Sequence, residues 1–260
     1  MASRRRRDQW PKLCAMVEQD DGLPVQVYGQ WTEEKLHFWN RYVEITTAAM
    51  VGHPAWAAGL VYVDLFAGPG VCAIKESGRR LPGSPLIAAC APKPFREILL
   101  CELSDESMHA CEERIRRLAP ECSATFFRGD CNERIGDIVR RIPNGALTLA
   151  FIDPQGLDFS FDTIRRLAQR GRVDLLILIA DAVDFARNVD TIYYGSLTLS
   201  SIAFSVQIQT GVPGGVLWEI LRVLGRGASS PTSTRIGFGN WDIFNSARRR
   251  SRRVGALSTD

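Results

Sequence analysis

The sequence predicts an α/β fold with a doubly wound, mostly parallel sheet. Continuous apolar runs alternate along the chain with segments whose apolar residues recur at helical spacing. Such runs are typical of parallel strands buried on both faces, and right-handed crossovers bring their carboxyl ends to one edge of the sheet. An acid lies at or just after the carboxyl end of each of the first four runs. We therefore expect Asp64, Glu102, Asp130 and Asp153 to lie at the edge where open α/β sheets bind ligands.

Residues 1–30 show no clear periodicity and are interpreted as a basic tail and lead-in. A helix is predicted next, from Thr32 as N-cap to about Ala49. Its apolar residues recur at spacings of three and four, forming one face. We expect this face to pack on the sheet, and the helix could also cover a cofactor or contact a substrate.

The first strand is predicted at residues 60–66, ending in a glycine turn with Gly68 and Gly70. Asp64 lies four residues before Gly68. A carboxylate at this position would repel a pyrophosphate but suits the α-ammonium and sulfonium of S-adenosylmethionine (SAM). Residues 68–73 also fit the loose dinucleotide fingerprint G-x-G-x-x-G/A, so a nicotinamide cofactor remains an alternative. The expected cofactor-binding residues of this strand and turn are Asp64, Phe66, Gly68 and Gly70.

Residues 71–82 are expected to form an extended loop, after which Ser84 caps a short helix that has Pro85 as its first residue. The second strand is predicted at residues 95–101 and is followed directly by Glu102. A carboxylate there can accept hydrogen bonds from two ribose hydroxyls, so Glu102 is an expected cofactor-binding residue.

Ser104 or Asp105 should cap the next helix, and the third strand is predicted at residues 123–127. Asp130 follows this strand. It is expected either to accept a hydrogen bond from the adenine amine of the cofactor, or to cap the helix that contains Ile135, or to do both.

The fourth strand, residues 146–152, leads into the sequence Asp153-Pro154-Gln155-Gly156. Because this step lies in the expected ligand crevice, Asp153, Pro154 and Gln155 are the candidate catalytic residues. A helix at about residues 161–169 and a fifth strand at residues 173–180 complete the pattern.

Composition argues for an ordinary globular protein, with 45% hydrophobic and 23% charged residues. No apolar run approaches the roughly 20 residues of a membrane span, and no apolar region follows the N-terminal arginines as in a secretory signal. We therefore expect a cytoplasmic protein without a membrane partner. The seven cysteines are odd in number and lack a C-x-x-C pair, so buried thiols are expected rather than disulfides or a metal site.

The net charge of +3 conceals an uneven distribution. Residues 4–7 contribute four arginines, and residues 248–253 contribute five. Without these nine arginines the sequence has 23 basic and 29 acidic residues, so the rest of the chain carries a formal charge of −6. The two clusters are interpreted either as solvated tails or as contacts for nucleic acid or an anionic surface.

Several motifs between residues 31 and 188 together carry a family resemblance. They are Lys35, Leu36 and Tyr42, residues 62–70 (YVDLFAGPG), 83–88 (GSPLIA), 151–156 (FIDPQG) and 174–177 (DLLI), and Arg187 with Asn188. Over these residues the chain resembles the class I SAM-dependent methyltransferases, and within them the three-Cys-motif partner (TcmP) family. This resemblance implies a Rossmann-like fold of the class I methyltransferase type, SAM binding, and a partner protein with a three-cysteine motif. It implies no particular methyl acceptor.

Residues 153–156 are also imperfectly similar to the Asp-Pro-Pro-aromatic motif of methyltransferases that act on adenine or cytosine amines, with Gln155-Gly156 in place of Pro-aromatic. This similarity makes nucleic acid a candidate acceptor, with Asp153 orienting the amine. Phe159 or Phe161 would supply the stacking face, although core packing is the plainer use of both.

The pattern stops after residue 188, and residues 189–260 are interpreted as a divergent, irregular C-terminal segment. Residues 191–220 contain a single charged residue, Glu219. Either this stretch forms a β-rich hairpin at the sheet edge, or the reading frame of the gene has changed there.

The sequence therefore favours a SAM-dependent methyltransferase of the TcmP family whose acceptor is not identified. A non-catalytic SAM-binding interaction protein is the alternative, and an NAD-type oxidoreductase the third choice.

Overall fold

The computed structural model describes residues 8–154, 159–170, 172–180, 205–209 and 218–224. All of them belong to one compact unit, Met1–Gly227. The remaining unit, Ala228–Asp260, lies outside the described residues.

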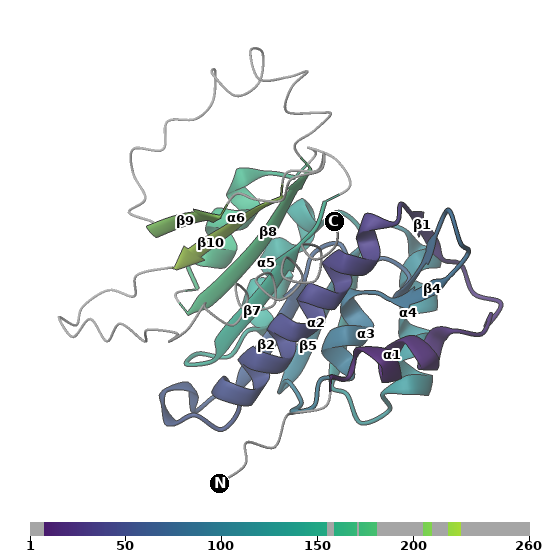
Figure 1. The fold of residues 1–260 in the computed structure, drawn as a ribbon. Coiled ribbons are helices and arrows are strands. Elements are labelled where there is room, and N and C mark those ends of the chain that lie inside the picture. The colour runs from purple at the N-terminus through teal and green to yellow at the C-terminus, as the bar shows by residue number, and fades with distance from the viewer. Residues whose placement is uncertain (1–7, 155–158, 171, 181–204, 210–217, 225–260) are drawn as a thin grey trace, which may run out of the picture. The chain divides into compact units, whose positions relative to one another are not determined.

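The described strands include a seven-stranded sheet in the order β6-β5-β2-β7-β8-β10-β9. The first five strands in this order are parallel, and β10 runs antiparallel to both β8 and β9. The direction of strand order reverses between β2 and β7, which creates a topological switch point (Figure 1). The predicted doubly wound, mostly parallel fold is thus confirmed. The strands are β2 (Leu60–Asp64), β5 (Glu97–Glu102), β6 (Ala124–Arg128), β7 (Leu147–Ile152), β8 (Val173–Ala180), β9 (Ser205–Gln209) and β10 (Trp218–Leu224).

The described helices cover both faces of the sheet. Alternate residues of a strand point to opposite faces, so in β2 Tyr62 packs with one group of helices and Val61 and Val63 pack with the other. The first group is α1 (Trp10–Val17), α2 (Trp31–Met50), α3 (Ser84–Ala89) and α4 (Asp105–Leu118). The second group is α5 (Cys131–Arg141) and α6 (Phe161–Ala168), which lie behind the sheet in Figure 1. A 3₁₀ turn, η1 (Pro54–Trp56), precedes β2.

The segment before α2 contains structure that the sequence did not predict. The apolar side chains of α1, including Trp10 and Leu13, are buried in the core on the α2 side of the sheet. Strand β1 (Gln26–Tyr28) pairs in parallel with β3 (Val71–Ile74), and β3 pairs antiparallel with β4 (Arg80–Pro82). The stretch expected as an extended loop at residues 71–82 therefore forms a hairpin of β3 and β4. Strand β1, from the segment expected as a lead-in, extends this hairpin to a three-stranded sheet.

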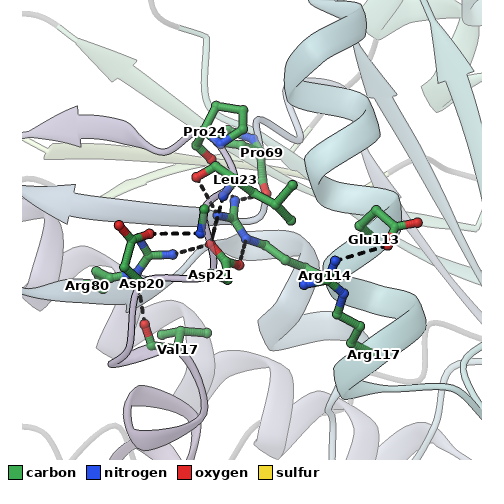
Figure 2. Close-up of polar contacts among 11 residues, drawn as sticks. Val17, Asp20, Asp21, Leu23, Pro24, Pro69, Arg80, Glu113, Arg114 and Arg117 are labelled. Carbon is green, nitrogen blue, oxygen red and sulfur yellow. Dashed lines mark hydrogen bonds and ion pairs between the residues drawn. The ribbon is translucent and has the colours of Figure 1, made fainter.

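A buried arginine holds this N-terminal segment in place. The Arg114 side chain is 1% exposed, and its guanidinium donates to both carboxylate oxygens of Asp21, at 2.7 and 2.8 Å. It also donates to the backbone carbonyls of Leu23, Pro24 and Pro69 (Figure 2). Arg114 therefore ties the chain before β1 to both α4 and the glycine turn.

Two expected helix caps differ from the structure and two agree with it. Helix α2 has Gln30 at its N-cap, so Thr32 lies inside the first turn, and α3 has Gly83 at its N-cap, so Ser84 is a helical residue. Ser104 does cap α4, and Asp130 caps α5 by accepting from the Asn132 N–H. Gly83 stands where a Cβ would lie 3.0 Å from the Gly70 carbonyl oxygen, which explains why this N-cap has no side chain.

The C-terminal segment contributes β9 and β10, which form an antiparallel pair at the sheet edge. The rest of residues 189–260 lies outside the described residues, and the change of reading frame stays a hypothesis. Among the helices that the structure describes, none combines the length and the apolar character that crossing a membrane requires.

Candidate functional site

A cavity of about 310 Å³ opens at the carboxyl ends of the parallel strands. Its walls come from the glycine turn, the residues that follow β5, β6 and β7, strand β1 and the first turns of α2. Most of the acids predicted from the sequence meet here, because Glu102, Asp130 and Asp153 all line this cavity.

The glycine turn forms the centre of the cavity wall. Gly68 and Gly70 have φ angles of +61° and +80°, a conformation that glycine adopts without steric cost. A Cβ at Gly68 would lie 2.6 Å from the Gln26 amide oxygen, so β1 packs directly against this turn. The chain then enters β3 rather than a helix, which is a departure from the dinucleotide-binding turn.

The Glu102 carboxylate links the glycine turn to the start of α4 through two hydrogen bonds. Its Oε2 accepts from the Gly68 N–H and its Oε1 accepts from the Ser104 N–H, each at 2.9 Å. A carboxylate oxygen has two acceptor positions, so both oxygens can still accept from hydroxyls of a ligand in the cavity.

Asp130 shows how one carboxylate can cap a helix and face a ligand at the same time. Its Oδ1 accepts from the Asn132 N–H at 2.8 Å, and the residue also lines the cavity beside Cys131. Asn132 in turn accepts from the Ser160 N–H and the Thr163 hydroxyl, which ties the start of α6 to the start of α5.

Asp64 differs from the expected direct contact with a ligand. The side chain is fully buried and is not among the residues that line the cavity. Its carboxylate accepts from the Tyr62 hydroxyl and the Phe66 N–H, at 3.0 and 3.1 Å. Burial raises the pKa of Asp64 to about 7, although the Ser84 hydroxyl and the Phe66 N–H favour the charged form. Asp64 therefore lies behind the wall, in contact with the residues that form it.

This raised pKa makes stability depend on pH. The folded protein holds the Asp64 proton more tightly than the unfolded chain, whose pKa is near 3.8, so stability falls as pH rises from there to about 7. Asp64→Asn removes the titration. In urea unfolding of the ligand-free protein, we expect the wild type to lose about 3 kcal/mol relative to this variant between pH 5 and 8. Asp105→Asn, at an exposed residue, is the control, and a constant difference for Asp64→Asn would contradict the prediction.

An ion pair in the cavity was not predicted. Lys35 on α2 donates to Asp153 Oδ2 at 2.5 Å, although 118 residues separate the two in sequence. The ammonium also lies 4.6 Å from the ring centre of Trp31 and 5.4 Å from that of Tyr28. The available signal was a lysine on the apolar face of a predicted helix, four residues before the buried Trp39.

The other predicted site residues have different outcomes. Pro154 lines the cavity, whereas Gln155 lies outside the described residues. Phe66 lines the cavity and contacts Phe159 edge to face, with ring centres 5.6 Å apart. Phe161, the other suggested stacking residue, is exposed at the start of α6 and does not line the cavity.

Two thiols line the cavity without offering a nucleophile. Burial raises the pKa of Cys72 to about 12 and that of Cys131 to about 11. Since the thiolate is the reactive form, neither group is activated near neutral pH.

The strand order and the cavity beside the switch point define a doubly wound α/β protein of the Rossmann-like class.

No protein-family model and no curated protein matches the chain. The O-methyltransferase TomG from Streptomyces achromogenes, solved in complex with SAM, is similar at 9% identity and a TM-score of 0.49, over 73% of this chain and 80% of TomG. The METTL16 MTase domain is similar at 11% identity and a TM-score of 0.48, over 82% of this chain and 78% of that one. At these values neither similarity identifies the ligand or the reaction of this chain.

Proposed function

We propose that this chain binds SAM and transfers its methyl group. The charge of the cavity is the observation that carries the proposal. Among the described residues, three acids, Glu102, Asp130 and Asp153, line it together with one basic residue, Lys35. An acidic site favours a cofactor with a net positive charge, such as SAM, and disfavours the pyrophosphate of a dinucleotide.

The backbone around the glycine turn supports the same choice of cofactor. Pyrophosphates bind to N–H groups at the start of a helix that follows such a turn. Here the Gly68 N–H donates to Glu102, the Gly83 N–H donates to the Gly70 carbonyl, and Pro85 has no N–H. In addition, β10 is antiparallel where a classic dinucleotide domain would add another parallel strand.

We assign the binding roles along the row of strand ends. Asp130 is proposed to accept from the adenine amine and Glu102 from the ribose hydroxyls. The glycine turn, with Phe66, Gly68 and Gly70, would hold the methionine portion. Asp64 would act on that portion only through Ser84 and the turn backbone, since its carboxylate does not line the cavity.

The chain's own contribution to catalysis would be positional. SAM supplies an activated methyl group when it is bound, so the transfer needs little acid–base chemistry beyond orientation in a dry site. Asp153 is proposed to orient the acceptor with Pro154 and Gln155. Membership of the TcmP family, a three-cysteine partner and a nucleic-acid acceptor are further proposals, and these rest on the sequence motifs alone.

Isothermal titration calorimetry with SAM, S-adenosylhomocysteine and NAD tests the cofactor. We expect the first two ligands to bind and NAD to bind far more weakly. Tight NAD binding without SAM binding would overturn the assignment in favour of the oxidoreductase.

A second measurement separates an enzyme from a binding protein. The purified chain is incubated with SAM carrying a labelled methyl group and with cell extract, and a variant with Glu102→Ala serves as the control. We expect label in macromolecules with the wild type and much less with the variant at a limiting concentration of SAM. SAM binding without any transfer would favour the non-catalytic interaction protein.

A further inference from the structure

The wall of the cavity formed by α2 carries polar groups that the proposed roles do not use. Thr32 and Lys35 both line the cavity from the first turns of α2. Residues three apart on a helix lie on the same side, so the two side chains are placed to contact the same group of a ligand. The ion pair of Lys35 with Asp153 places this wall at the end of β7.

This wall lies at the far end of the cavity from the proposed adenine site. Asp130 follows β6 and Asp153 follows β7, and the order β6-β5-β2-β7 separates these strands by three spacings. At about 4.8 Å for each spacing, the two ends lie roughly 14 Å apart. A ligand whose nucleoside occupies the Glu102 and Asp130 end therefore extends its other end toward Lys35.

The hydroxyl of Thr32 has no hydrogen-bond partner among the described residues, although the residue is only 1% exposed. Such buried hydroxyls normally find a partner, and leaving one without is unfavourable. The helix start at Trp31 causes this, because Thr32 does not occupy the N-cap position where its oxygen would accept from the backbone.

The Lys35 ammonium also has hydrogen-bond donors that the described acceptors do not use. Its residue is 7% exposed, and an ammonium group has three N–H donors. Asp153 is the single hydrogen-bond acceptor that the described residues provide for it. The ion pair and the faces of Trp31 and Tyr28 hold the charge in the cavity wall, where two donors remain for a ligand.

We propose that Lys35 and Thr32 bind the α-carboxylate of the methionine end of the cofactor, an inference that rests on the proposed SAM binding. One oxygen would accept from the Lys35 ammonium. The other would accept from the Thr32 hydroxyl after that side chain turns toward the cavity, because its oxygen has almost no accessible surface in this structure. A singly charged carboxylate suits this site better than a phosphate, because Asp153 already offsets the positive charge of Lys35. The amino acid's own ammonium further balances the acids of the cavity.

The test compares two ligands that differ only in the amino-acid portion that contains this carboxylate. S-adenosylhomocysteine contains the amino acid, and methylthioadenosine has the same nucleoside and thioether without it. Calorimetry is performed with the wild type, Lys35→Met and Thr32→Val, and with Thr32→Ser as a control that keeps the hydroxyl. Thermal unfolding checks that each variant is folded, and Lys35→Gln replaces Lys35→Met if the latter is not.

We expect Lys35→Met to weaken S-adenosylhomocysteine binding by about tenfold or more, because a charge-assisted hydrogen bond is lost. Thr32→Val should weaken it by about fivefold, and Thr32→Ser by less than about twofold. Methylthioadenosine should bind all variants about equally. Equal losses for both ligands, or no loss for either, would overturn the carboxylate assignment while leaving SAM binding intact. Failure of the wild type to bind either ligand would overturn the proposed function itself.

Discussion

Replacement of Arg114 by methionine is expected to lower the free energy of unfolding by about 3 kcal/mol, the low end of what breaking a buried ion pair costs. Methionine fills much of the same space, so the loss comes from the hydrogen bonds. Asp21 and the carbonyls of Leu23, Pro24 and Pro69 all lose a donor. The estimate is at the low end because Asp21 keeps its contact with Arg80 at 2.7 Å. Urea unfolding followed by circular dichroism measures this change.

Arg117, one turn further along α4, is the matched control. It is exposed and, within the part of the chain that the structure describes, pairs only with Glu113, at 3.3 Å, so Arg117→Met should leave stability within measurement error (Figure 2). A comparable loss for both variants would show that the buried contacts of Arg114 are not the cause.

Acid provides a second measurement of the same contact. Hydrogen bonds from Arg114 hold the pKa of Asp21 well below its usual range. The resulting stability is present in full above the unfolded pKa of about 4 and is lost as pH falls below it. The difference between wild type and Arg114→Met should therefore shrink between pH 6 and pH 3. A mere packing defect would leave this difference unchanged.

Glu102→Ala should weaken S-adenosylhomocysteine binding by tenfold or more. The change removes the proposed acceptor of the ribose hydroxyls and also leaves the Gly68 N–H without its partner. Glu102→Gln keeps the shape and one acceptor oxygen, so it should fall between the wild type and Glu102→Ala. Titration calorimetry on the folded variants measures the three affinities.

Glu106→Ala is the control for this series, because Glu106 is exposed in the first turn of α4 and does not line the cavity. Its affinity should equal that of the wild type. An unchanged affinity in Glu102→Ala would refute the placement of the ribose at the end of β5.

The parallel sheet could be predicted because its signals are local. Strands β2, β5 and β7 are buried on both faces, so most of their residues are apolar, and Ser104 and Asp130 mark helix starts by their own chemistry. Strands β1, β3 and β4 could not be predicted in this way. They are three or four residues long, and β1 is paired with a segment 46 residues later, from Gln26 to Cys72.

The part of the site that lies at the carboxyl ends of the strands could be predicted, because parallel strands bring these ends to one edge of the sheet. Glu102, Asp130 and Asp153 meet in one cavity as the fold class requires. Two features depend on packing between distant segments and were not predictable from spacing. One is the burial of Asp64 behind the wall, and the other is the pairing of Lys35 with Asp153. The correct spacing of an acid from a glycine does not show which way its side chain points.

The hydrogen bond from Arg114 to the glycine turn has a consequence for the order of folding. Asp21 and Arg114 are 93 residues apart, and Pro69 and Arg114 are 45 apart. The entropy of closing such long loops must be overcome before these contacts stabilise anything. During synthesis the turn emerges from the ribosome well before α4, so its contact with Arg114 can form only after the chain has grown some 45 residues past it.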